Sequence, residues 1–111
     1  MSKNLEMPVL FDFYGKILTE KQRITLEMYY NSDLSLGEIS DEIKITRQGV
    51  LNCIKSSEAK LVELEEKLGL AKRLNKLEED INELTMYTNN IVDQEIRNEI
   101  QLKISDIMKN I

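Results

Sequence analysis

The chain has 111 residues and a mass of 12.9 kDa, which allows one domain with or without an appended arm and excludes a large multidomain enzyme. Hydrophobic residues make up 41% of the chain and charged residues 32%, a composition that excludes a disordered or collagen-like protein. The net charge of −5 argues against a protein that coats nucleic acid nonspecifically, because such binding rests on many lysine and arginine contacts to phosphate.

Apolar residues at helical spacing predict two helices in the first third of the chain. The first covers residues 8–18, where Pro8 occupies a tolerated first-turn position. The second opens at Thr19, because Thr19 and Gln22 have the spacing of a capping box, and its apolar face runs out at residues 31–33.

The same capping-box spacing, between Ser35 and Glu38, predicts a short helix over residues 36–43. After a brief turn, Thr46 is placed to cap a much longer helix with apolar residues in a heptad rhythm. We expect this long helix to end at Gly69, since glycine is the usual residue just beyond a helix.

The heptad rhythm resumes after Gly69 and predicts an arm of amphipathic helices, with a break at Asn89-Asn90. No stretch shows sustained strand alternation, so we expect an all-α protein. The apolar stripes must be covered, either by folding back on the N-terminal helices or by the arms of a second copy in a homodimer. The residues expected at such an oligomerisation surface are Leu61, Leu64, Leu68, Leu74, Leu77, Ile81 and Leu84.

Basic residues are concentrated in one short segment. Residues 1–43 carry four basic and eight acidic groups, residues 44–60 carry four basic and one acidic, and residues 61–111 carry seven basic and eleven acidic. Any anion that this protein binds is therefore expected to contact residues 44–60, which we call the basic segment.

The basic segment coincides with a helix-turn-helix pattern over residues 35–55, in which a short helix, a tight turn and a second helix follow one another. In this motif the second helix enters the major groove of DNA and its first turns meet the base edges. Glutamine and asparagine can pair with adenine, arginine with guanine, and lysine with phosphate or guanine. The residues expected to contact nucleic acid are Lys44, Thr46, Arg47, Gln48, Asn52, Lys55 and Ser56. The sequence thus predicts a helix-turn-helix domain over residues 1–68 and an oligomerisation arm over residues 69–111.

Three stretches of the chain resemble the YlxM family of small helix-turn-helix proteins of Gram-positive bacteria. They are FYGKILTEKQ at residues 13–22, LEMYYNSDLSLGEISDE at residues 26–42 and TRQGVLNCIKSSEAKL at residues 46–61. The motif is also similar to region four of bacterial sigma factors. The resemblance implies a dimeric, cytoplasmic helical protein that regulates or assists the signal recognition particle pathway.

Two residues depart from the usual helix-turn-helix pattern. Lys44 stands where many such motifs have glycine, so either a left-handed lysine there is strained by about 1–2 kcal/mol or the turn is built differently. Gly49 replaces the usual alanine, which weakens the second helix by up to about 1 kcal/mol.

Three classes of function remain to be compared. The first is a regulator that binds nucleic acid, either DNA or the RNA of the signal recognition particle, through the basic segment. The second is an adaptor whose acidic arm docks the signal-recognition-particle GTPase without binding nucleic acid.

The third class, an enzyme, is disfavoured. The sequence has no histidine, and its adjacent carboxylates, such as Glu65 and Glu66, diverge by about 100° on a helix and cannot form a converging acid–base pair. We therefore expect no cofactor and no metal. One cysteine, Cys53, cannot form an internal disulfide and fits a reducing cytoplasm, and no apolar run is long enough for membrane insertion.

Overall fold

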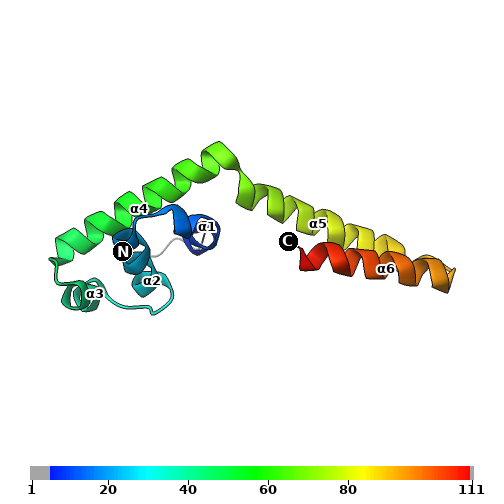
Figure 1. Ribbon diagram of the computed structural model, residues 1–111, viewed down its shortest axis with the longest axis horizontal. Helices are drawn as coiled ribbons and strands as arrows, with labels where there is room; N and C mark the ends of the chain where they lie inside the picture. The colour runs from blue at the N-terminus through cyan, green and yellow to red at the C-terminus, as the bar shows by residue number, and fades with distance from the viewer. Residues whose placement is uncertain (1–5, 111) are drawn as a thin grey trace. The chain divides into compact units, whose positions relative to one another are not determined.

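The computed structural model describes residues 6–110, which form six α-helices and one short 3-10 helix (Figure 1). No β-strand occurs among these residues, so the predicted all-α class is confirmed. The chain divides into two compact units, Met1–Ala71 and Lys72–Ile111, and each is described by itself.

The first predicted helix is divided in the structure. Helix α1 spans Met7–Tyr14 with Pro8 in its first turn, and the 3-10 helix η1 spans Gly15–Ile17. A Cβ on Gly15 would lie 2.9 Å from the Phe11 ring, so only glycine lets this ring pack against the backbone. Glycine also weakens α-helix, and together these effects explain the change to the tighter 3-10 helix.

Both predicted capping boxes are present. Helix α2 spans Glu20–Tyr30, and the Gln22 amide donates to the Thr19 hydroxyl at 3.2 Å while the Gln22 side chain accepts from the Thr19 amide at 3.1 Å. Helix α3 spans Leu36–Ile43 and begins with the same reciprocal pair between Ser35 and Glu38. These bonds satisfy amides that the first helical turn leaves without partners.

The turn between α3 and α4 is built on a left-handed lysine. Lys44 has φ 61° and ψ 41°, and its amide donates to the Ser40 carbonyl at 3.0 Å. The Ser40 hydroxyl then donates to the carbonyl of Ile45, which ties the turn to α3. The hydrogen bonds at both ends of the turn hold Lys44 in a conformation that would suit glycine better.

Helix α4, Arg47–Leu68, supplies the central stripe of the core of the first unit. Figure 1 shows it running along α1, α2 and α3, all of which contact it. Its buried side chains are Val50, Ile54, Ser57 and Leu61. The apolar core also includes Phe11, Tyr14, Leu18, Leu26, Tyr29 and Ile39. The buried Ser57 hydroxyl is satisfied because it donates to the Cys53 carbonyl at 2.6 Å.

A buried tyrosine holds the junction between α4 and α5. The Tyr14 hydroxyl donates to Glu65 at 2.6 Å and accepts from the amide of Leu70 at 3.1 Å. The same Glu65 oxygen accepts from the amide of Ala71 at 3.0 Å. Burial, and then the hydrogen bond to Glu65, raise the pKa of Tyr14 above its ordinary 10.0, so the hydroxyl keeps its proton.

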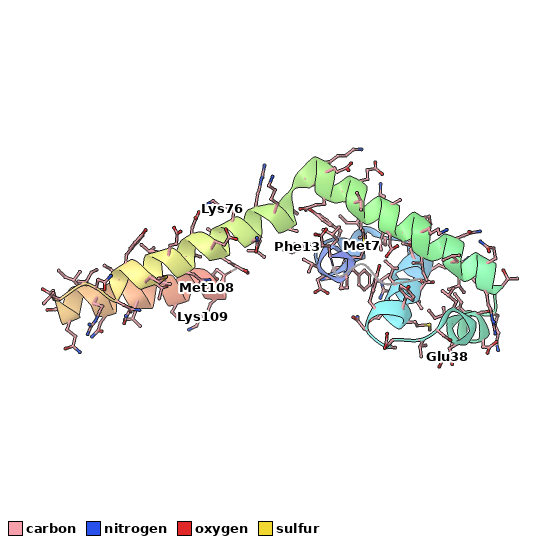
Figure 2. The ribbon with its side chains drawn as sticks, turned by 180° about the vertical axis from the view of Figure 1, so that it is seen from behind. Met7, Phe13, Glu38, Lys76, Met108 and Lys109 are labelled. Carbon is pink, nitrogen blue, oxygen red and sulfur yellow. The ribbon has the colours of Figure 1, made fainter. Side chains whose placement is uncertain are left out.

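The second unit is a pair of antiparallel helices, with α5 spanning Leu70–Thr88 and α6 spanning Gln94–Lys109. The predicted break at Asn89-Asn90 is confirmed, and Asp93 caps α6 by accepting from the Ile96 amide at 3.1 Å. Figures 1 and 2 show α6 lying alongside α5. The last turn of α6, with Met108 and Lys109, lies near Lys76 of α5 in Figure 2.

Two of the residues expected at an oligomerisation surface are covered within their own units. Leu61 is fully buried against the core of the first unit, and Ile81 is buried within the second unit. Their side chains are thus covered without a second chain. Leu64 also packs against the first core, whereas Leu68, Leu77 and Leu84 are exposed and Leu74 is half-buried.

Within residues 6–110, no helix combines the length and the apolar character needed to cross a membrane.

Replacing Tyr14 with phenylalanine keeps the buried ring and removes only the hydroxyl. Glu65 and the Leu70 amide then lose a hydrogen-bond partner, so we expect the free energy of unfolding to fall by about 1–3 kcal/mol in urea titrations followed by circular dichroism. The control is Tyr87→Phe, because Tyr87 is 67% exposed. Equal stability of Tyr14→Phe and the wild type would contradict the role of this hydroxyl.

Two substitutions at Lys44 distinguish the effect of backbone strain on stability from the effect of losing the lysine charge. Lys44→Gly and Lys44→Ala both remove the ammonium, but only glycine adopts φ 61° without a steric penalty. We expect the glycine variant to be more stable than the alanine variant by about 1 kcal/mol in the same urea titrations. If alanine is as stable as glycine, the turn does not strain its residue.

Candidate nucleic-acid interface

The outer face of α4 opposite the core brings four of the predicted contact residues together. Gln48, Asn52, Lys55 and Ser56 are all exposed, while Val50 and Ile54 are buried on the other side of the helix. Gln48 Nε2 donates to Asn52 Oδ1 at 3.0 Å. This bond leaves the Gln48 carbonyl oxygen and the Asn52 amino group as one acceptor and one donor, the pair that adenine requires in the major groove.

Thr46 has a structural role at the start of α4. Its hydroxyl accepts from the Gly49 amide at 3.0 Å, which confirms the predicted cap. A Cβ on Gly49 would lie 3.2 Å from that hydroxyl oxygen, so glycine leaves the cap undisturbed. The side chain of Thr46 is therefore engaged with its own helix, and the start of the helix supplies a positive dipole end.

The side chain of Arg47 points in a different direction from those of the other predicted contact residues. Its guanidinium lies against Gly37 of α3, because a Cβ built on Gly37 would be 3.0 Å from one terminal nitrogen. Arg47 is nevertheless exposed. The structure therefore places Arg47 over the first turn of α3, where a phosphate beside the motif is a better target than a base edge.

The basic side chains of the motif have no carboxylate partner within residues 6–110, and Lys16 and Lys21 of the same unit share this property. Within residues 6–110, Lys44, Arg47 and Lys55 form no ion pair, and all three are exposed. Elsewhere, Arg23 pairs with Glu27, Lys60 and Lys67 pair with Glu63, and Lys76 pairs with Asp80. The positive charge at the helix-turn-helix is thus not neutralised locally.

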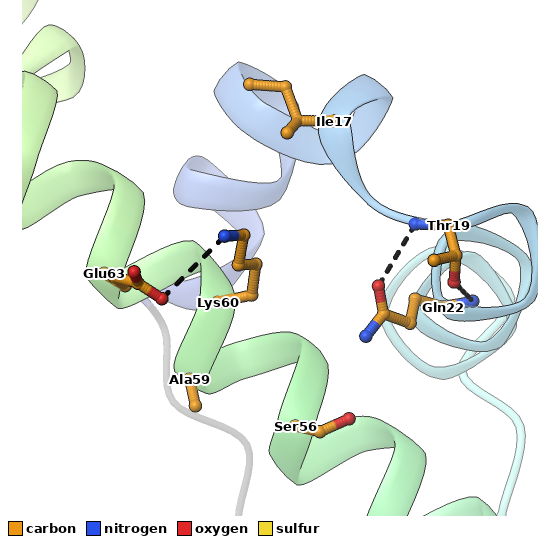
Figure 3. A pocket seen from close by; sticks show the side chains of 7 residues that line it. All are labelled: Ile17, Thr19, Gln22, Ser56, Ala59, Lys60 and Glu63. Carbon is orange, nitrogen blue, oxygen red and sulfur yellow. Dashed lines mark hydrogen bonds and ion pairs between the residues drawn. The ribbon is translucent and has the colours of Figure 1, made fainter.

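Sequence reasoning missed the contribution of α2 to this surface. Two adjoining hollows of about 430 and 470 Å³ lie between the start of α2 and the outer face of α4. Figure 3 shows the residues that line the first of them. Both are lined by Thr19, Gln22 and Ser56, and the second is also lined by Lys21 and Asn52. The charge count could not reveal Lys21, because this lysine belongs to a segment with an acidic total.

Among residues 6–110, no three cysteine, aspartate or glutamate side chains are grouped so that they could hold a metal ion.

Comparison with known proteins matches residues 1–110 to the family UPF0122, described as "Putative helix-turn-helix protein, YlxM / p13 like". A UPF0122 protein of Thermoanaerobacter sp. (strain X514) is 43% identical over 107 residues, which cover 96% of this chain and 92% of the relative. A UPF0122 protein of Halalkalibacterium halodurans is 48% identical over 84 residues, covering 76% and 77%. One from Acetivibrio thermocellus is 36% identical over 117 residues, covering 99% and 100%.

The family match covers nearly the whole chain and includes the three stretches that carry the sequence resemblance, as well as the helix-turn-helix formed by α3 and α4. This chain belongs to the UPF0122 family of YlxM and p13-like helix-turn-helix proteins.

Proposed function

We propose that this protein is a regulator that binds double-stranded DNA through the helix-turn-helix formed by α3 and α4. The observation that carries this proposal is the set of exposed cations without an ion pair along the helix-turn-helix, with Lys44 in the turn, Arg47 at the start of α4 and Lys55 about two turns further along it. They stand out because the chain has a net charge of −5. Unpaired cations favour phosphate binding through the release of counterions.

The proposed contacts fall into two groups. Gln48 and Asn52 offer a donor and an acceptor on the outer face of α4 and are assigned to base edges, with Lys55 and Ser56 beside them. Arg47, held over α3, and Lys44, in the turn, are assigned to phosphates. Together the two groups would fix the register of α4 and then read the bases.

Duplex DNA suits this arrangement better than duplex RNA. The major groove of B-form DNA admits an α-helix, whereas the deep and narrow major groove of A-form RNA does not. Binding to the RNA of a signal recognition particle would instead require loops, bulges or phosphates, and this outcome is included in the test below.

The test replaces Arg47, Gln48 and Lys55 together with alanine. The wild-type protein first selects sites from a random duplex pool, and fluorescence anisotropy then measures the affinity for the selected duplex. Losing three contacts at about 1 kcal/mol or more each lowers affinity at least about 100-fold. The matched control replaces Arg73, Asn75 and Lys76, three exposed residues of α5, with alanine.

Circular dichroism checks that both triple variants keep the helical content of the wild type. Wild-type affinity in the α4 variant, or failure of the wild type to enrich any duplex, would rule out DNA binding by this face. Preference for single-stranded or structured RNA in parallel titrations would replace DNA as the target.

We further propose that the second unit joins two copies into a homodimer. This unit has 40 residues, and its buried side chains are Ile81, Thr88 and Ile104 among those described. Units of about 40 residues usually need a disulfide, a metal or oligomerisation to remain folded. A second copy would supply the missing apolar contacts.

The two flanks of the α5–α6 pair differ in chemistry. One flank carries Asn75, Asn82 and Asn89, and Asn89 accepts a hydrogen bond from Gln101 of α6 at 3.2 Å. By helical spacing the other flank carries Leu77 and Leu84, which are 43% and 46% exposed. The same spacing places three isoleucines of α6 on this apolar flank, and they are Ile96, Ile100 and Ile107. Two apolar flanks placed together would give a four-helix bundle.

Replacing Leu77 and Leu84 with aspartate is expected to convert the dimer into a monomer, because the four introduced carboxylates would be buried without partners. The molecular mass in solution is measured by light scattering after gel filtration. The matched control replaces Asn75 and Asn82 with aspartate, which adds the same charge to the polar flank and keeps the dimer. A monomeric wild type, or a dimeric leucine variant, would contradict the proposal.

The alternative adaptor function depends on the acidic half of the chain. Residues 61–111 carry four more acidic than basic groups, which favours a basic protein partner. Association with the signal-recognition-particle GTPase stays a prediction from the family resemblance. Affinity capture of the tagged protein would support this alternative if the GTPase is recovered after nuclease treatment and is no longer recovered when the second unit is removed.

A further inference from the structure

The two hollows beside α4 form one continuous groove, which we call the α2–α4 groove. They share three lining residues, Thr19, Gln22 and Ser56. On α4 the lining runs from Gly49 to Glu63, about 21 Å at 1.5 Å per residue. The groove adjoins the proposed base-reading face, because Asn52 and Ser56 belong to both.

The polar lining suits the sugar–phosphate backbone of a nucleic acid. Hydroxyl and amide groups come from Thr19, Gln22, Asn52 and Ser56, and a lysine comes from each helix, Lys21 from α2 and Lys60 from α4. Such groups are the usual donors to phosphate and sugar oxygens. The one carboxylate in the lining, Glu63, is already paired with Lys67 at 2.9 Å and with Lys60 at 3.9 Å.

Two side chains of α2, Gln22 and Lys21, offer hydrogen-bond donors to the groove. The Gln22 side-chain oxygen is occupied by the Thr19 amide, so the Gln22 amino group remains as a donor, and Figure 3 shows it on the side of the bond that faces α4. Lys21 is exposed and forms no ion pair with any residue between 6 and 110. Lys21 is therefore the strongest candidate for a phosphate contact outside α3 and α4.

We infer that the α2–α4 groove holds the sugar–phosphate backbone of the same nucleic acid whose bases α4 reads, with Lys21 as its main phosphate contact. This inference rests on the proposed function and extends the interface beyond the helix-turn-helix to a helix in the acidic part of the chain. The duplex would then be held from two sides of α4, by Arg47 over α3 and by Lys21 on α2.

The first test measures the salt dependence of affinity for the duplex selected by the wild type. Loss of one phosphate contact in Lys21→Ala lowers the slope of log affinity against log salt by about 0.9. Between 50 and 200 mM salt, the wild type would consequently lose about threefold more affinity than the variant. The matched control is Lys16→Ala, because Lys16 is an exposed lysine of the same unit that lines neither hollow.

The second test uses the cysteine that the protein already has. Cys53 lines the groove and is the single cysteine of the chain, so its alkylation rate reports occupation of the groove without any substitution. Bound duplex is expected to slow alkylation of Cys53 at least fivefold under conditions where more than nine-tenths of the protein is bound. Circular dichroism of both lysine variants checks that the fold is retained.

The outcomes separate this inference from the proposed function. Duplex binding that leaves Cys53 reactivity unchanged, or a Lys21→Ala slope equal to that of Lys16→Ala, would overturn the groove while leaving recognition by α4 in place. Failure of the wild type to bind any duplex would overturn both.

Discussion

The division of α4 into a buried face and an exposed face is the constraint on which the first unit depends. Val50, Ile54, Ser57 and Leu61 commit one side of this helix to the core, and α1, α2 and α3 each pack against it. The opposite side must then remain in solvent, and it carries the amides and the lysine proposed to meet nucleic acid. Because one rigid helix serves both purposes, the core directly sets the orientation of the proposed interface.

Local hydrogen bonds fix the ends of the helices that pack in the core. The capping boxes at Thr19 and Ser35 fix where α2 and α3 start, and the Thr46 cap fixes the start of α4. At the far end of α4, Tyr14 and Glu65 hold the first amides of α5. The start of α4 is thereby capped and its far end is tied to α1, so the proposed contact residues lie on a well-supported element.

Local signals in the sequence predicted the helices well because they act over three or four residues. Both capping boxes, the end of α4 at Gly69 and the break at Asn89-Asn90 occur where the pattern indicated. The 3-10 helix after Tyr14 was missed, because it depends on the Phe11 ring packing against Gly15. The burial of Leu61 in the core of the first unit could not be predicted, since a heptad rhythm does not say which helices will cover a residue.

By itself, the sequence determined the all-α class, the helix-turn-helix and its unusual basic segment, because periodicity, caps and charge are all properties of short stretches. Tertiary structure decided that Arg47 turns toward Gly37 of α3 and that Lys21 reaches the surface beside Asn52 and Ser56. These placements join residues far apart in the chain, and only the packing of α2 and α3 against α4 brings them together.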